Sequence, residues 1–140
     1  LELTEHVLLA ADATQVDALE RVRAMGVRIA LDDFGTGYSS LTHLRRFPVD
    51  VVKIDRSFVE GMTHNAGDAA IISAVVDLSR TFNFRVVAEG IETAQQLDVQ
   101  QQLGCHGAQG FLIGRPKPAA AFAELLSTRV PLGRMVGLVA

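Results

Sequence analysis

Two adjacent aspartates, Asp32 and Asp33, close an apolar run of the sequence, and the loop glycines Gly35 and Gly37 follow. Both carboxylates are ionised at neutral pH, and a hard divalent cation such as Mg²⁺ or Mn²⁺ would offset their mutual repulsion. In the alternative interpretation, one aspartate caps the following helix and the other is simply solvated. The pair alone leaves both interpretations open, because short motifs also match by chance.

Polar residues close the later apolar runs of the chain as well. Asp55 ends the run Val51–Asp55, Glu89 ends the run Arg85–Glu89, and Gln109 lies near the start of a further short run. The carboxyl ends of consecutive parallel strands meet at one end of a barrel, where barrel enzymes place their active sites. This recurrence favours a metal site over scattered, solvated acids.

The elements that must position these residues alternate regularly along the chain. Leu1–Leu3 has the pattern of a strand end, and further strands are predicted over Arg28–Leu31, Val51–Asp55, Arg85–Glu89 and Ala108–Leu112. Helices are predicted from Asp12 or Thr14 to about Met25, from Ser39 or Ser40 to before Pro48, from Asp68 to near Asn83, from Thr93 through Leu103, and over Ala119–Leu126. A turn or a short helix is predicted over Phe58–Met62.

Strands that alternate with helices predict an α/β fold, in which helices cover a parallel sheet. A complete (β/α)8 barrel needs about 250 residues, and this chain has 140. We therefore expect a partial (β/α)8 TIM-type barrel that comprises roughly its last four to five βα units.

Composition narrows the class of protein further. The chain is 49% hydrophobic with a formal net charge of -3, as expected for one soluble globular domain. It has no basic run for a nucleic-acid polymer and no stretch of roughly 20 apolar residues for a membrane span. The single Cys105 fits a reducing compartment. We therefore expect a cytoplasmic location, to which upstream segments could add a tether to the inner membrane.

Five blocks of the sequence carry a family resemblance: Glu2–Glu5, Asp32–Leu41, Val52–Arg56, Ala88–Thr93 and Gln109–Phe111. In this order and spacing they resemble the EAL domain, the bacterial cyclic-di-GMP phosphodiesterase family, from Leu1 to about Leu126. The resemblance implies that residues 1–128 are the C-terminal portion of an EAL domain and that residues 129–140 are a C-terminal tail. It also implies metal-dependent hydrolysis of cyclic di-GMP to linear pGpG.

The resemblance implies a role for each matching site residue. The expected metal ligands, for Mg²⁺ or Mn²⁺, are Glu2, Asp32 and Asp33, and the expected catalytic residues are Glu89, Lys53 and Asp55. The residues expected to line the substrate site or to support its loop are Glu5, Gly35, Thr36, Gly37, Glu92 and Gln109. The loop region Asp33–Leu41 is also expected to form a homodimer.

Other interpretations stay open at this point. Lys53 could form an ion pair with Asp55 or Glu89 that only supports the barrel. The alternative function is a catalytically inactive EAL-like domain that acts as a cyclic-di-GMP receptor or as a protein-interaction module. Because the resemblance places a further glutamate and an asparagine ligand in an N-terminal half, we expect these 140 residues alone to hydrolyse the substrate poorly or not at all.

Overall fold

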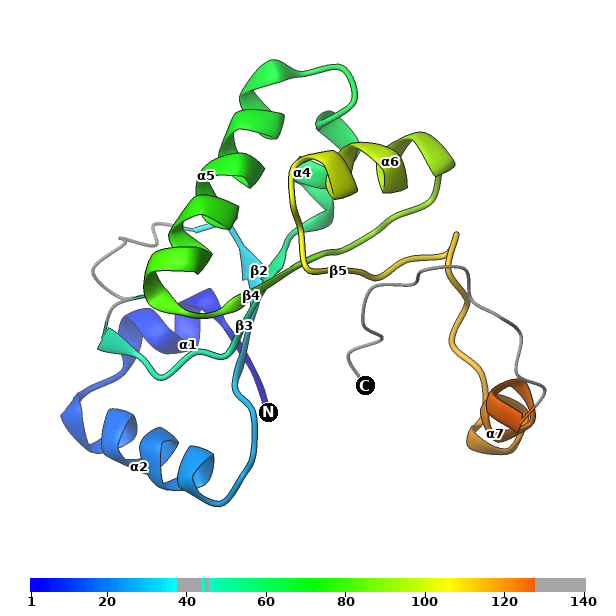
Figure 1. Ribbon diagram of the computed structural model, residues 1–140. Coiled ribbons are helices and arrows are strands. Elements are labelled where there is room, and N and C mark those ends of the chain that lie inside the picture. Colours follow the sequence, from blue (N-terminus) through cyan, green and yellow to red (C-terminus); the bar gives the residue numbers. More distant parts are fainter. Residues whose placement is uncertain (38–43, 45, 128–140) are drawn as a thin grey trace.

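The computed structural model describes residues 1–37, 44 and 46–127. These residues form a parallel sheet whose strands alternate with helices along the chain (Figure 1). The sheet has five strands in the order β1-β2-β3-β4-β5, and every neighbouring pair is parallel. The strands are β1 (Glu2–Thr4), β2 (Ala30–Phe34), β3 (Val51–Ile54), β4 (Arg85–Ala88) and β5 (Gly107–Ala108). Sequential parallel order is the arrangement of consecutive βα units in a TIM-type barrel, so the fold is a partial α/β barrel.

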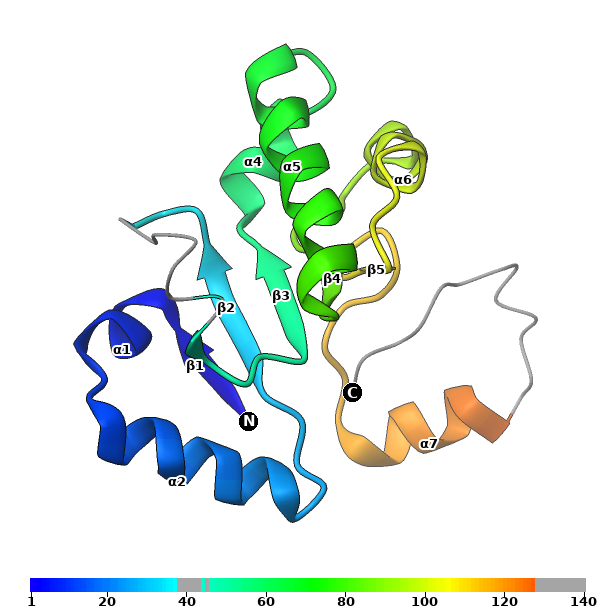
Figure 2. The same ribbon diagram turned by 60° about the vertical axis from the view of Figure 1, so that its left-hand side comes forward.

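The described helices lie mainly on one face and at one end of this sheet (Figure 2). They are α1 (Glu5–Ala10), α2 (Ala13–Ala24), α4 (Arg56–Gly61), α5 (Ala66–Phe82), α6 (Ala94–Gln102) and α7 (Ala119–Ser127). Helix α4 contacts both α5 and α6, whereas α7 lies apart from these three helices in both views. No described helix is long and apolar enough to cross a membrane.

Local capping residues explain where several helices begin and end. The Asp12 side chain accepts from the Gln15 amide at the start of α2, and Thr93 and Gln96 form the same reciprocal capping box at α6. Helix α5 ends at Asn83, whose left-handed backbone has a φ of 59°. These observations confirm the predicted helices at these positions, with Asp12 rather than Thr14 as the cap.

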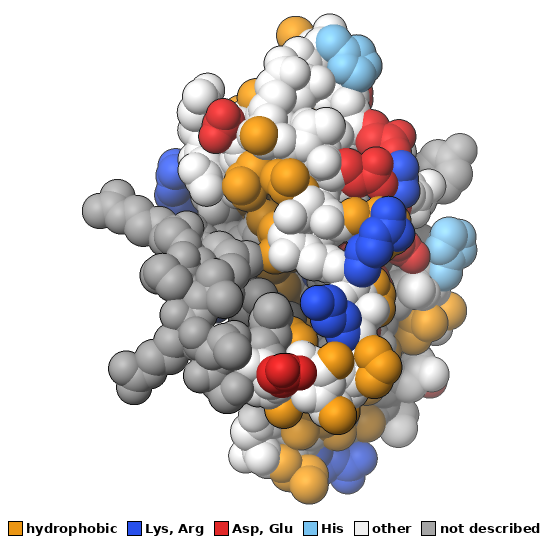
Figure 3. Space-filling model, turned by 90° about the vertical axis from the view of Figure 1, so that its right-hand side faces the viewer, with side chains coloured by type: hydrophobic (Ala, Val, Ile, Leu, Met, Phe, Trp, Pro, Cys, Tyr) orange, Lys and Arg blue, Asp and Glu red, His pale blue; other side chains and the backbone are white. Residues whose placement is uncertain are grey.

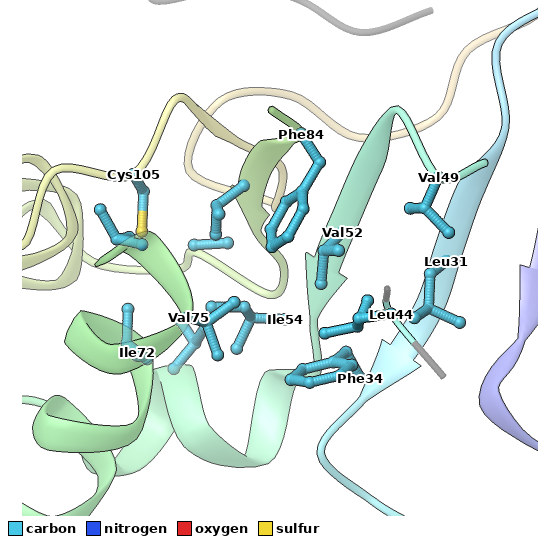
Figure 4. Packing of buried hydrophobic residues seen from close by; sticks show 14 of the residues in the cluster. Leu31, Phe34, Leu44, Val49, Val52, Ile54, Ile72, Val75, Phe84 and Cys105 are labelled. Atoms are coloured by element: carbon cyan, nitrogen blue, oxygen red, sulfur yellow. The ribbon is translucent and has the colours of Figure 1, made fainter. Parts of the chain in front are cut away.

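The hydrophobic core lies between the sheet and the helices that cover one of its faces (Figure 4). Val52 and Ile54 of β3 point into this core and pack in one cluster with Ile72 and Val75 of α5. Because side chains alternate along a strand, Lys53 lies on the opposite face of β3. The core therefore fixes the strand that carries Lys53 without burying the ammonium group in it.

The structure corrects several predicted element boundaries. The strand predicted over Arg28–Leu31 is Ala30–Phe34, so both Asp32 and Asp33 belong to it rather than to the following loop. The strand predicted over Ala108–Leu112 is only Gly107–Ala108, because backbone hydrogen bonds turn the next residues back on themselves. Helix α1 was not predicted, and most of the helix expected after Ser39 or Ser40 lies outside the described residues.

Charged and apolar side chains are interspersed over the face of the molecule that Figure 3 shows. Acidic and basic groups adjoin one another there, and ion pairs such as Arg80–Asp77 and Arg56–Glu92 join described side chains elsewhere along the chain. On this face, the described side chains therefore form no single-sign patch that would attract a polyanion.

Candidate active site

Lys53 is the centre of a cluster of carboxylates that neighbouring units of the sheet supply. Its Nζ lies 2.7 Å from Glu89 Oε1, 3.0 Å from Asp32 Oδ1 and 3.1 Å from Glu2 Oε1. Glu2 comes from β1, Asp32 from β2 and Lys53 from β3, and Glu89 follows β4 directly. Four consecutive parallel units therefore each contribute one charged side chain to the same point in space.

Three of the acids could hold a metal ion together. One carboxylate oxygen from each of Asp32, Asp33 and Glu89 lies within 4.8 Å of the other two. Oxygen donors of this kind suit Mg²⁺ or Mn²⁺ better than Zn²⁺, which prefers histidine and cysteine. The donor set therefore fits the metal ions that the sequence predicts. Glu2 reaches the cluster through Lys53, and its side chain is 61% exposed.

An irregularity in β2 brings both aspartates to this cluster. The register between β2 and β3 shifts between Leu31 and Phe34, and Asp33 has a positive φ of 54°. In a regular strand, neighbouring side chains point to opposite faces of the sheet. The irregular backbone removes this alternation, so Asp32 and Asp33 can both direct an oxygen toward Glu89.

Burial and neighbouring charges have opposing effects on the pKa values of Lys53 and Glu89. Burial lowers the pKa of Lys53, but its hydrogen bonds to Glu89, Asp32 and Glu2 outweigh that effect, so the pKa is raised overall. Burial raises the pKa of Glu89, Lys53 opposes this rise, and the nearby charges of Asp32 and Asp33 add to it. Lys53 thus stays charged, and Glu89 is a stronger base than an exposed glutamate.

Glu5 connects α1 to the glycine loop that follows β2. Its side chain is only 1% exposed, and Oε2 accepts a hydrogen bond of 3.1 Å from the Gly35 amide. A Cβ at Gly37 would lie 2.7 Å from Glu5 Oε1, so the loop backbone approaches the carboxylate closely. The Thr36 hydroxyl donates to the Asp33 carbonyl over 2.9 Å. Glu5 is therefore placed where it holds the first part of this loop.

Asp55 follows β3 but caps the next helix. Its Oδ1 accepts from the Ser57 amide over 2.9 Å at the start of α4. Among the described ion pairs of Lys53, the partners are Glu2, Asp32 and Glu89, so the alternative Lys53–Glu89 pair forms and a Lys53–Asp55 pair does not.

Glu92 and Gln109 lie farther out at the rim of the cluster. The Glu92 carboxylate lies 3.2 Å from Arg56 Nη1 and forms an ion pair with it. Gln109 has an exposed side chain, and its backbone joins the Ala88 carbonyl to the Ile91 amide. Through these backbone bonds, the segment after β5 supports the segment that carries Glu89.

Comparisons with known proteins now identify the family. The family model described as "EAL domain" matches residues 1–116. The chain belongs to the EAL domain family. It is 53% identical over 120 residues to the bifunctional diguanylate cyclase/cyclic di-GMP phosphodiesterase MucR of Pseudomonas aeruginosa, covering 85% of this chain and 17% of MucR.

Solved EAL structures share the fold. The phosphodiesterase PaMucR, solved as a c-di-GMP complex, aligns with a TM-score of 0.81 and 49% identity over 87% of this chain and 49% of that chain. BlrP1 of Klebsiella pneumoniae, solved as a manganese/cy-diGMP complex, aligns with a TM-score of 0.77 and 36% identity, over 82% of this chain and 29% of its own. The chain thus spans less than a fifth of MucR and about half of the PaMucR chain.

Two supporting contacts in this EAL chain involve residues that the sequence did not single out as functional. Arg56 contacts both Glu60 and Glu92. His106 Nδ1 accepts from the Val86 amide over 3.0 Å and so supports β4 from its β5 side. The Arg56–Glu92 contact and the Val86–His106 contact each join residues from different βα units, and no spacing within the sequence indicates them.

Proposed function

We propose that this EAL chain is part of a metal-dependent phosphodiesterase that hydrolyses cyclic di-GMP to linear pGpG. The observation that carries the proposal is the convergence of Glu2, Asp32, Lys53 and Glu89 from four consecutive βα units, with Asp33 beside them. A phosphodiester anion repels an incoming water oxygen, so its hydrolysis needs positive charge and a base at one place. This cluster supplies both.

Asp32, Asp33 and Glu89 would hold Mg²⁺ or Mn²⁺, with Glu2 as a further ligand. When bound, such an ion lowers the pKa of water and offsets the charge of the phosphate. The MucR and BlrP1 structures, solved with c-di-GMP and with manganese and cy-diGMP, support this assignment. The proposal covers both ions, Mg²⁺ and Mn²⁺.

Lys53 and Glu89 take complementary roles in the proposed reaction. The Lys53 ammonium group directs its positive charge toward the phosphate oxygen on which negative charge develops. Glu89, whose pKa is raised by burial, accepts the proton of the attacking water on a carboxylate oxygen. Asp55, which caps α4, keeps the segment after β3 in place beside them.

The remaining assignments concern the loop and the rim. Glu5 holds the loop of Gly35, Thr36 and Gly37, and two rim residues, Glu92 and Gln109, line the approach of the substrate. A homodimer through the loop region Asp33–Leu41 and a cytoplasmic location belong to the same proposal. Residues 38–41 of that region lie outside the described residues.

The domain division proposed from the sequence places a boundary between residues 128 and 129. The family match over residues 1–116 supports the EAL assignment of the first part. The proposed tail, residues 129–140, lies outside the described residues.

The test compares Asp32→Asn, Glu89→Gln and Asp77→Asn in the full-length protein. Asp77 is exposed on α5 and serves as the matched control. Formation of the linear dinucleotide is followed by chromatography, and Mn²⁺ binding is followed by calorimetry. We expect turnover to fall by about 100-fold or more in the first two variants. Asp32→Asn also weakens Mn²⁺ binding, whereas Asp77→Asn retains wild-type values.

Two results would contradict the proposal in different ways. Unchanged Mn²⁺ binding in Asp32→Asn would remove that residue from the metal site. Binding of cyclic di-GMP by the wild-type protein without any turnover would instead establish the receptor alternative.

A further inference from the structure

Arg56 lies across the segment that carries Glu89 and joins it to a neighbouring helix. It is the first residue of α4, directly after Asp55. Its guanidinium group forms ion pairs with Glu60 on the same helix and, through Nη1 at 3.2 Å, with Glu92. The group therefore connects the unit of β3 with the segment that follows β4.

The stem of Arg56 also covers the most adaptable residue of that segment. Gly90 has a positive φ of 73°, and a Cβ there would lie 2.5 Å from Arg56 Cγ. Glycine can adopt more backbone conformations than any other residue. The close approach of the Arg56 methylene groups therefore restricts the residue that follows Glu89 immediately.

The backbone bonds around this segment hold Glu89 on two sides. The Glu89 amide donates to the Ile54 carbonyl over 3.1 Å, and the Ile91 amide donates to the Gln109 carbonyl over 3.0 Å. Gly90 lies between these two anchors. Arg56 is the side chain that lies against it at the point between them.

We propose that Arg56 is a positioning residue that fixes the segment from Glu89 to Glu92 and thereby directs the Glu89 carboxylate at Lys53. Arg56 acts through Gly90 and Glu92 and does not contact the reacting atoms. The three side chains of the ion-pair network are 40% to 54% exposed, so the pairs contribute little to global stability. Their proposed effect is instead to fix the position of the segment from Glu89 to Glu92.

The inference rests on the proposed function, and its test has two independent readouts. The first is the split between kcat and KM for cyclic di-GMP in the full-length protein. Misplacement of a reacting group by about 1 Å can cost about 100-fold. We therefore expect Arg56→Ala to lower kcat by about 10- to 100-fold and to change KM by less than about 3-fold.

A variant of Glu92, the partner of Arg56, and a variant of the exposed Arg80–Asp77 ion pair complete the kinetic measurement. Because Arg56 acts through Glu92, Arg56→Ala and Glu92→Gln together should lower kcat no more than about 2-fold beyond the larger single effect. Arg56→Lys retains the charge and recovers part of kcat. Arg80→Ala removes an exposed pair with Asp77 on α5 and leaves both constants within about 2-fold of wild type.

The second readout is hydrogen exchange of the peptide that contains Glu89 and Ile91, which needs no activity. We expect exchange there to accelerate by about 10-fold in Arg56→Ala and to be unchanged in Arg80→Ala, because Arg56 lies against Gly90 whereas Arg80 pairs with Asp77 on α5. If the wild-type protein is inactive, the proposed function is contradicted, and hydrogen exchange still tests the positioning role of Arg56. Unchanged exchange, or a rise in KM at constant kcat, would overturn the positioning role.

Discussion

Replacing Lys53 by methionine removes the ammonium group that contacts three carboxylates, while the length of the side chain is kept. The contact with Glu2 is exposed and contributes less than about 1 kcal/mol. Asp32 and Glu89 have side chains that are 23% and 17% exposed, and without a partner their charges repel each other. Breaking a buried pair costs about 3–5 kcal/mol. Because these side chains are partly exposed, we expect Lys53→Met to lower the free energy of unfolding by about 2–4 kcal/mol.

The assay is urea unfolding of the wild-type protein and of Lys53→Met at pH 7 in EDTA and again in excess Mn²⁺. In EDTA the variant should show the full loss. A metal ion that binds only the folded state at 100 times its Kd adds about 2.7 kcal/mol. We therefore expect Mn²⁺ to recover most of the lost free energy of unfolding, because the cation replaces the positive charge.

The pH dependence of the same variant follows from Glu89. Burial raises its pKa above the usual value of 4.5, and the loss of Lys53 raises it further. A folded state whose carboxyl has a raised pKa loses stability as pH rises above the unfolded pKa. The deficit of Lys53→Met should therefore be small near pH 4 and should grow between pH 4.5 and 7.

Arg80→Met is the matched control, because it removes the cation of an exposed pair, and it should cost less than about 0.5 kcal/mol. A free energy of unfolding for Lys53→Met in EDTA within about 0.5 kcal/mol of wild type would refute the reasoning. The carboxylates would then not depend on Lys53 for charge compensation.

Two further predictions concern the strands that support the site. A Cβ at Gly110 would lie 2.1 Å from the Ile91 carbonyl oxygen, so Gly110→Ala should cost about 3 kcal/mol in urea unfolding. Gly114→Ala is its control, because a Cβ there has no atom of the described residues within 4 Å apart from its chain neighbours, and equal effects would contradict the expected clash. His106 accepts from the Val86 amide, and burial together with nearby arginines lowers its pKa. Its contribution is present above about pH 6.5 and is lost as pH falls. His106→Ala should therefore flatten the loss of stability between pH 7 and 5, and an unchanged slope would contradict this assignment.

Features that depend on neighbouring residues could be predicted from the sequence. Thr93 and Gln96 lie three positions apart, which is the spacing of a capping box, and the structure confirms that box. Alternation of strands and helices predicted the parallel sheet, and the structure confirms it. These signals are local or periodic, so one sequence contains them in full.

Features that depend on distant partners could not be predicted in the same way. The sequence placed Asp32 and Asp33 after their strand, because charged residues usually end an apolar run, whereas β2 contains both. Lys53 on the neighbouring strand makes the charged position of Asp32 favourable, and the distance along the sequence between the two residues hides this contact. The ion pair of Arg56 with Glu92 and the bond from Val86 to His106 likewise exist only once separate units are packed together.

The positive φ of Asp33 has a consequence for any attempt to make this domain more robust. Left-handed backbone costs a residue with a Cβ about 1 kcal/mol that glycine does not incur. A redesign that optimised stability alone would therefore select Asp33→Gly and discard one of the oxygen donors of the cluster. Stability and chemistry make opposite demands on this single backbone position, so thermostable variants of the domain have to be screened for retained function there.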